Sequence, residues 1–305
     1  MSTTPSMPTI DTHAHIWDMD RPWMGWLRQD PFFASVARTV TPADLVGALG
    51  GSGVAGVVLV QAATVVEETV ELLAVAAALP QVLGVVGWVD LDSAAATRRD
   101  LERLRTTPGG DRLVGVRHFG TGRRGQDALV DGRLAPAARV LAEHGLTLDV
   151  HMPDASTLGA VAELAEQVPG LRIVLNHLGR PDLRRGLDHL DWAGGIARLG
   201  GCPDLHVKYS GWSTRLRGPD PDAVRPFVGH VLEHVGHERV LFAGNWPVAL
   251  VSGSYAETLV ASRLAVDHLD GPALGRVFAG NALRVYRPPG GTPTTNPHHT
   301  MTRSR

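Results

Sequence analysis

Short apolar runs rich in Val, Leu and Ile recur along the chain, and stretches with apolar residues three and four positions apart separate them. The short runs are typical of parallel strands that are buried on both faces, and the spacing between them predicts amphipathic helices. At Thr41-Pro42-Ala43-Asp44, a capping residue, a proline and an acidic residue mark the start of a helix. The eight predicted strands are Thr9–His15, Gly56–Gln61, Val82–Val89, Leu113–His118, Leu146–His151, Leu171–His177, Leu205–Ser210 and Val240–Gly244.

Eight strands in alternation with helices predict an α/β fold of the (β/α)₈ TIM-barrel type. The alternative is an open, doubly wound sheet, but no Gly-x-Gly-x-x-Gly turn follows the first strand. We expect one domain over residues 9–287, because nothing interrupts the alternation. Residues 1–8 and 288–305 contain many small, polar and proline residues, so we predict that both ends are disordered.

Charge and composition exclude several classes of partner. The formal net charge is −2 and the pI about 6.7, so we expect no nucleic-acid partner and no membrane partner. A single cysteine, Cys202, rules out an internal disulfide and a cysteine-based zinc site. Without a membrane-length apolar run or a signal-peptide pattern, we expect a cytoplasmic protein. The oligomeric state is not predicted.

The ends of the predicted strands contain many histidines. Strand alternation places Asp11, His13 and His15 on one face of the first strand, and a His-x-His pair can provide two ligands to one metal ion. Asp11 lies deeper and could orient His13. Four further polar residues lie at or near strand ends, namely His151, His177, Lys208 and Asn245. Catalytic groups of such barrels gather at the C-terminal ends of the strands, so we expect the active site there.

A metal site is one possible use of these histidines. His13, His15 and His151 could hold a divalent ion such as Zn²⁺, because neutral imidazoles alone can bind zinc. The alternative is that His151 hydrogen-bonds the substrate. The sequence contains no motif for an organic cofactor.

Aromatic and basic residues near the strand ends are candidates for substrate binding. Trp17, Trp212 and Trp246 each follow a strand, so we expect them to rim the pocket, where their rings could stack on a cyclic substrate; packing between loops is the alternative. The pairs Arg123/Arg124 and Arg215/Arg217 could bind a carboxylate or could be surface charges.

Six segments resemble the amidohydrolase-related barrels, and most closely the sugar-lactone hydrolases of the fuconolactonase and rhamnonolactonase type. They are IDTHAHIW (10–17), VGVRHF (114–119), VLNHLGRP (174–181), KYSG (208–211), FAGNWPV (242–248) and GNALRVYR (280–287). The resemblance implies hydrolysis of a lactone ester, with a divalent metal in some relatives. It implies that His13 and His15 are metal ligands or polarise the carbonyl, and that His177 contacts metal, water or substrate. Arg117, His118 and Lys208 would bind a small substrate that is anionic or sugar-like.

Two positions depart from that family. Asn176 replaces an aspartate, and alternation points it away from the barrel interior. Asn245 replaces the eighth-strand aspartate that would be the general base, and an amide cannot accept a proton near neutral pH. Three hypotheses therefore remain: lactone hydrolysis with Asp149 or a histidine as base, a non-hydrolytic reaction (decarboxylation, elimination or ring closure), or a non-catalytic binding barrel.

Overall fold

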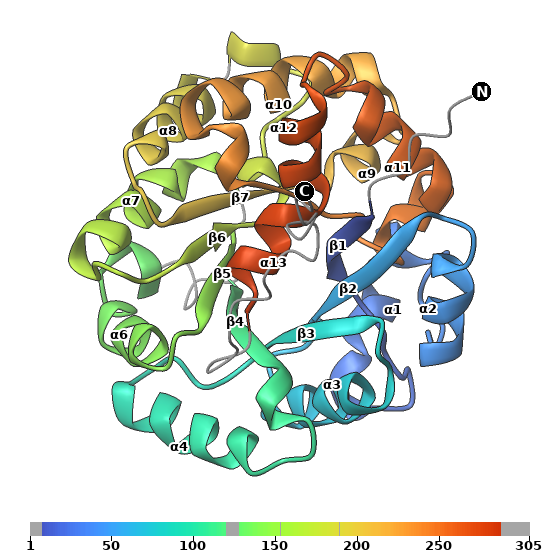
Figure 1. The fold of residues 1–305 in the computed structure, drawn as a ribbon. Coiled ribbons are helices and arrows are strands. Elements are labelled where there is room, and N and C mark those ends of the chain that lie inside the picture. The colour runs from blue at the N-terminus through green and yellow to red at the C-terminus, as the bar shows by residue number, and fades with distance from the viewer. Residues whose placement is uncertain (1–7, 120–127, 153, 189, 288–305) are drawn as a thin grey trace, which may run out of the picture.

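A computed structural model describes residues 8–119, 128–152, 154–188 and 190–287, so nearly all of both predicted disordered ends lies outside the described residues. Eight parallel strands follow one another in chain order around a barrel (Figure 1). They are β1 (Thr9–Ala14), β2 (Val54–Val60), β3 (Val82–Gly87), β4 (Leu113–Phe119), β5 (Thr147–His151), β6 (Ile173–Leu175), β7 (Leu205–Tyr209) and β8 (Val240–Phe242). A parallel bridge between Ala14 and Trp246 brings the two edge strands together. The predicted barrel is confirmed.

Helices connect the strands and cover the outside of the barrel (Figure 1). At the start of α2, the Thr41 hydroxyl accepts the N–H of Asp44 at 3.1 Å, and the Asp44 carboxylate accepts the N–H of Thr41 at 2.8 Å. This capping box begins the helix where the sequence predicts it. The helices are α1 (Trp26–Gln29), α2 (Pro42–Leu49), α3 (Val66–Ala78), α4 (Ala94–Arg105), α6 (Ala135–Glu143), α7 (Leu158–Gln167), α8 (Leu190–Gly200), α9 (Trp212–Leu216), α10 (Pro221–Val235), α11 (Tyr255–Leu264), α12 (Gly271–Gly275) and α13 (Asn281–Val285).

One end of the barrel is filled by the C-terminal segment. Ile10, Val58 and Val174 belong to an apolar cluster that also contains Val285 of α13 and Tyr286 after it. Figure 1 shows α13 lying across this end. Burial of these side chains closes the barrel from below and leaves the opposite, C-terminal end of the strands for a cavity.

The predicted side-chain alternation in β1 is wrong at Asp11. Asp11 pairs with Val57 and Ala14 pairs with Leu59, so β1 carries one residue more than β2 between these points. Side chains of a strand alternate between its two faces, so one extra residue places the side chains before the bulge on the face opposite to the expected one. The Asp11 carboxylate accepts from Tyr255 of α11 at 2.8 Å and from the backbone N–H of His13 at 2.8 Å. Asp11 therefore positions the backbone at His13 rather than its ring.

The predicted alternation in β6 is also wrong. Val174 joins the inner apolar cluster, whereas Ile173 and Leu175 pack in the larger outer one. Asn176 consequently points inward, and its amide donates to the Asp149 carboxylate at 3.2 Å. His177 still reaches the cavity because β6 ends at Leu175 and the backbone of His177 turns with φ 56°.

Within the described part of the chain, no helix is long and apolar enough to cross a membrane.

Candidate active site

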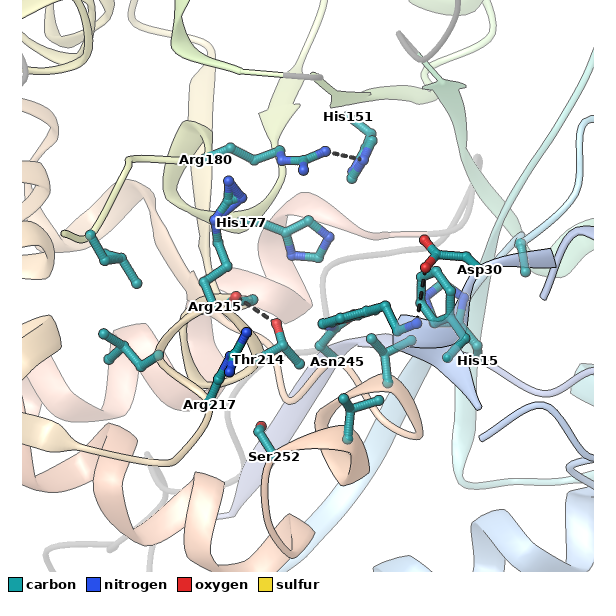
Figure 2. A pocket seen from close by; sticks show the side chains of 18 of the residues that line it. His15, Asp30, His151, His177, Arg180, Thr214, Arg215, Arg217, Asn245 and Ser252 are labelled. Atoms are coloured by element: carbon teal, nitrogen blue, oxygen red, sulfur yellow. Dashed lines mark hydrogen bonds between the residues drawn. The ribbon is translucent and has the colours of Figure 1, made fainter. Parts of the chain in front are cut away.

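A cavity of about 1260 Å³ opens at the C-terminal ends of the strands. Figure 2 shows side chains from several strand ends and the loops after them projecting into it. Eight of the candidate site residues named from sequence line it, namely His15, Trp17, Arg117, His151, His177, Arg215, Arg217 and Asn245. The barrel thus brings together residues that are up to about 230 positions apart, which is how this fold builds its sites.

Three histidine rings form a tight cluster, in which His15 and His177 line the cavity and the predicted site residue His13 lies behind them, outside the lining. The ring centroid of His13 lies 4.8 Å from that of His15 and 4.7 Å from that of His177. His13 is fully buried, and its Nε2 has no hydrogen-bond partner among the described residues. Buried nitrogens without a partner are rare in folded proteins, so this atom marks a place where the described residues leave a polar group unsatisfied.

Hydrogen bonds fix the ring orientations of His15 and His177. His15 Nδ1 lies 2.7 Å from the carbonyl oxygen of Val60, which can only accept, so a neutral His15 carries its proton on Nδ1 and a lone pair on Nε2. His177 Nδ1 lies 2.9 Å from the Ser210 hydroxyl. Each ring is thereby held by one nitrogen while the other stays available.

All three rings are neutral near pH 7. Burial, followed by the charge of Lys208, lowers the pKa of His13 well below its usual value. Burial and the charge of Arg117 lower the pKa of His15 to about 3 and also depress that of His177. Neutral imidazoles can accept a proton or bind a metal, whereas imidazolium ions can do neither.

A buried ion pair lies beneath the histidines. Lys208 Nζ is 2.6 Å from the Asp149 carboxylate, and both side chains are 0% exposed. Tyr286 donates to the same carboxylate at 2.9 Å, and Lys208 lies 3.3 Å from His13 Nδ1. When Lys208 donates to that nitrogen, a neutral His13 presents an N–H at Nε2; in the other tautomer Nε2 is a metal ligand. Asp149 does not line the cavity, and its oxygens are already occupied.

His151 lies between two guanidinium groups. Arg117 Nη2 is 3.0 Å from His151 Nδ1, and Arg180 Nη1 is 3.1 Å from His151 Nε2. Figure 2 shows the contact with Arg180. Both ring nitrogens face donors, so His151 offers no free nitrogen to a metal in this arrangement. Its assignment as a third metal ligand stays a prediction.

Asn245 lies at the cavity where the chain leaves β8. Its backbone is left-handed, with φ 56°, a conformation that Asn and Asp tolerate better than other non-glycine residues. The side chain lines the same cavity as His15 and His177. Position 245, where Asn replaces the aspartate expected from the family resemblance, is therefore part of the site.

Other predicted residues lie outside the cavity lining. His118 is buried and follows Arg117 on β4, and neighbouring strand residues point to opposite faces. Of the three tryptophans expected at the rim, Trp17 lines the cavity. Trp212 and Trp246 do not, and they are only 2% and 3% exposed. Arg123 and Arg124 lie outside the described residues.

Several lining residues were not singled out from sequence. Trp26, Asp30 and Phe33 come from the long connection between β1 and α2, which has no catalytic motif. Arg180 was inside the VLNHLGRP segment, three residues after His177, and that proximity was the available signal. Its side chain reaches His151 and the Met152 carbonyl.

The histidine pair of β1 fits a divalent metal ion in the tautomer of His13 that has its lone pair at Nε2, in which Lys208 does not donate to Nδ1. His15 has a lone pair at Nε2, and His13 has an unpartnered Nε2 in the cluster. Two neutral imidazoles of one strand are suitable zinc ligands. The described lining offers no carboxylate next to them on β8, because Asn245 stands there.

The fold and site together define a (β/α)₈-barrel enzyme with a histidine-rich centre at the C-terminal mouth. The model of the amidohydrolase family (Amidohydro_2) matches residues 10–287, and the chain belongs to that family. It is 34% identical over 289 residues to an L-fucono-1,5-lactonase of Burkholderia ambifaria, covering 91% of this chain and 95% of the relative. A second L-fucono-1,5-lactonase, of Burkholderia multivorans, is 27% identical, covering 92% and 96%.

Solved structures agree with this placement. An amidohydrolase of Burkholderia multivorans with bound zinc superposes with a TM-score of 0.82 at 25% identity, covering 92% of this chain and all of that one. An amidohydrolase of Bifidobacterium longum gives a TM-score of 0.70 at 25% identity, covering 92% and 99%. Decarboxylases with 14% to 19% identity share the fold alone.

Proposed function

We propose that this enzyme hydrolyses the ester bond of a small lactone at the histidine cluster. The observation that carries the proposal is the set of neutral histidines at the cavity floor, two of which line the cavity with an available ring nitrogen. The similarity to two lactonases along nearly the whole chain supports it. A lactone needs a proton acceptor for water and positive potential at its carbonyl oxygen, and the site supplies both.

His177 is the proton acceptor in this proposal. With Nδ1 donating to Ser210, its Nε2 takes a proton from water as the water oxygen attacks the carbonyl carbon. The ring carbon–oxygen bond then breaks, and the leaving alkoxide takes the proton back from His177. The products are one hydroxyl and one carboxylic acid, which ionises to a carboxylate and releases the second proton of the water, so lactone and water are the only reactants.

The carbonyl oxygen becomes negative during attack, and two cations are close to it. Arg117 lines the cavity, and Lys208 lies behind His13. Preorganised positive charge of this kind stabilises a developing oxyanion. A divalent metal such as zinc, held by His13 and His15, would polarise the same carbonyl as a Lewis acid.

A pH-stat assay with a panel of aldonolactones and simple δ-lactones tests the proposal. The wild type should release acid, and His177→Asn should lower kcat by roughly 10²–10⁴-fold, the usual effect of losing a positioned base. His144→Asn is the matched control, because His144 lies at the end of α6 next to Arg105, away from the cavity. A wild type that opens no lactone in the panel would overturn the proposal.

A further inference from the structure

Positive charge dominates the wall of the cavity. Five arginines line it against two aspartates, Asp30 and Asp182, and Asp182 already pairs with Arg184 at 3.3 Å. The arginines are Arg117, Arg180, Arg184, Arg215 and Arg217.

Two of these arginines are largely enclosed and are influenced by carboxylates only at longer range, Arg117 by Asp149 and Glu68 and Arg180 by Asp154. Within the described part of the chain, neither Arg180 nor Arg117 forms an ion pair, and the polar contacts of both are backbone carbonyls and His151. A neutral imidazole has one lone pair, so His151 can accept properly from only one of the two guanidinium groups. The other arginine retains an unused donor at the cavity.

Arg180 also faces a second cation. Burial and then the charge of Arg215 lower the pKa of Arg180 to about 10, so Arg180 remains protonated at neutral pH. Arg215 lies on α9 and projects into the same cavity, and Figure 2 shows both arginines on the side away from Asp30 and His15. The carboxylates that act on these two arginines are Asp182, near Arg215, and Asp154, near Arg180, but Asp182 also pairs with Arg184. Arginines still outnumber aspartates in the lining, and guanidinium groups that face a cavity are suitable partners for a carboxylate.

We propose that the substrate carries a carboxylate, which binds between Arg180 and Arg215 while its lactone carbonyl lies at the histidines. This inference rests on the proposed lactone hydrolysis and narrows its substrate class. A neutral sugar lactone would leave the excess of arginine over aspartate at the cavity unchanged, whereas a carboxylate accepts bidentate hydrogen bonds from guanidinium groups.

The test uses a matched pair of substrates: a δ-valerolactone with a carboxylate on the carbon next to the ring oxygen, and the corresponding primary carboxamide. The wild type should prefer the carboxylate by about 10- to 100-fold in kcat/KM, as expected for charge-assisted hydrogen bonds. Arg215→Gln and Arg180→Gln should each reduce that preference by about 10-fold, mainly through KM. Arg98→Gln is the control, because Arg98 pairs with Glu143 on the surface, and the preference should stay unchanged. Equal rates for the two lactones would overturn the inference and leave lactone hydrolysis intact.

A second measurement separates this inference from the proposed reaction. Glutarate, glutaramide and inorganic phosphate are compared for their effect on the Tm of wild type and Arg215→Gln. Stabilisation by glutarate alone, lost in the variant, supports the carboxylate site even if neither lactone is hydrolysed. No stabilisation by glutarate, or a larger effect of phosphate, overturns the carboxylate assignment.

Discussion

Asp149→Asn should destabilise the barrel by about 3–5 kcal/mol, the usual cost of breaking a buried ion pair. Lys208 and Asp149 are 0% exposed and 2.6 Å apart, so the variant leaves a buried ammonium without its counter-ion. Tyr286 donates to both carboxylate oxygens, at 2.9 and 3.0 Å, and an amide cannot accept at both atoms. The loss in the free energy of unfolding is measured by urea denaturation followed by circular dichroism.

A double-mutant cycle isolates the pair. Asp149→Asn/Lys208→Met should be more stable than the sum of the two single losses predicts, by about 2 kcal/mol, because residues in one ion pair are not additive. The hypothesis that Asp149 is the relocated base predicts instead that Asp149→Asn loses turnover while the free energy of unfolding changes little. If Asp149→Asn unfolds within about 1 kcal/mol of the wild type and yet abolishes turnover, the structural reading of the pair is refuted.

Three further predictions follow from buried groups. Burial raises the pKa of the Glu68 carboxyl group from 4.5 to about 7, so the folded state holds this proton more tightly than the unfolded state and stability is lost as pH rises through that interval. Compared with Glu68→Gln, the wild type should lose roughly 3 kcal/mol in the free energy of unfolding between about pH 4.5 and 7.5, measured by urea titration. The same pH dependence in both proteins would contradict this prediction. Gly244→Ala should cost about 1–3 kcal/mol in the same assay, because the added Cβ would lie 2.5 Å from both Asp11 and Tyr255; an unchanged midpoint would show that the strand can shift. His15→Ala should lower the zinc content measured by plasma emission after dialysis at least 10-fold, and equal content would place the metal elsewhere.

The order of elements could be predicted from sequence because each strand and helix carries its own local signal. All eight strands lie where the apolar runs predicted them, and the helix at Thr41 begins at its capping box. The gathering of His15 and His177 followed from the fold, since parallel strands of a barrel end on the same face.

Side-chain direction could not be predicted from alternation alone. The β1 bulge depends on contacts of Asp11 with Tyr255 and Gly244, which are more than 230 residues away in the chain. In β6 the expected direction of Asn176 was wrong, whereas His177 reaches the cavity as expected only because the strand ends early and the backbone turns. Register is set by such long-range contacts, and no local pattern encodes them.

The cavity wall was the least predictable part of the site. Arg180 and Asp30 lie in connections after strands, where neither periodicity nor a catalytic motif marks a residue. Loops take their conformation from the scaffold beneath them, so their convergence becomes visible only when the barrel is assembled.

The central claim, lactone hydrolysis at a site where Asn245 replaces a carboxylate, is tested most directly by proton NMR of wild type and Asn245→Asp. Each protein is incubated with the lactone panel and with a panel of aromatic carboxylic acids. We predict that the wild type opens a lactone and that Asn245→Asp opens it about one to three orders of magnitude faster, because a carboxylate restores a general base and Asp tolerates the backbone with φ 56°. Loss of CO₂ from an acid by the wild type, with no lactone opened by either protein, would contradict the account.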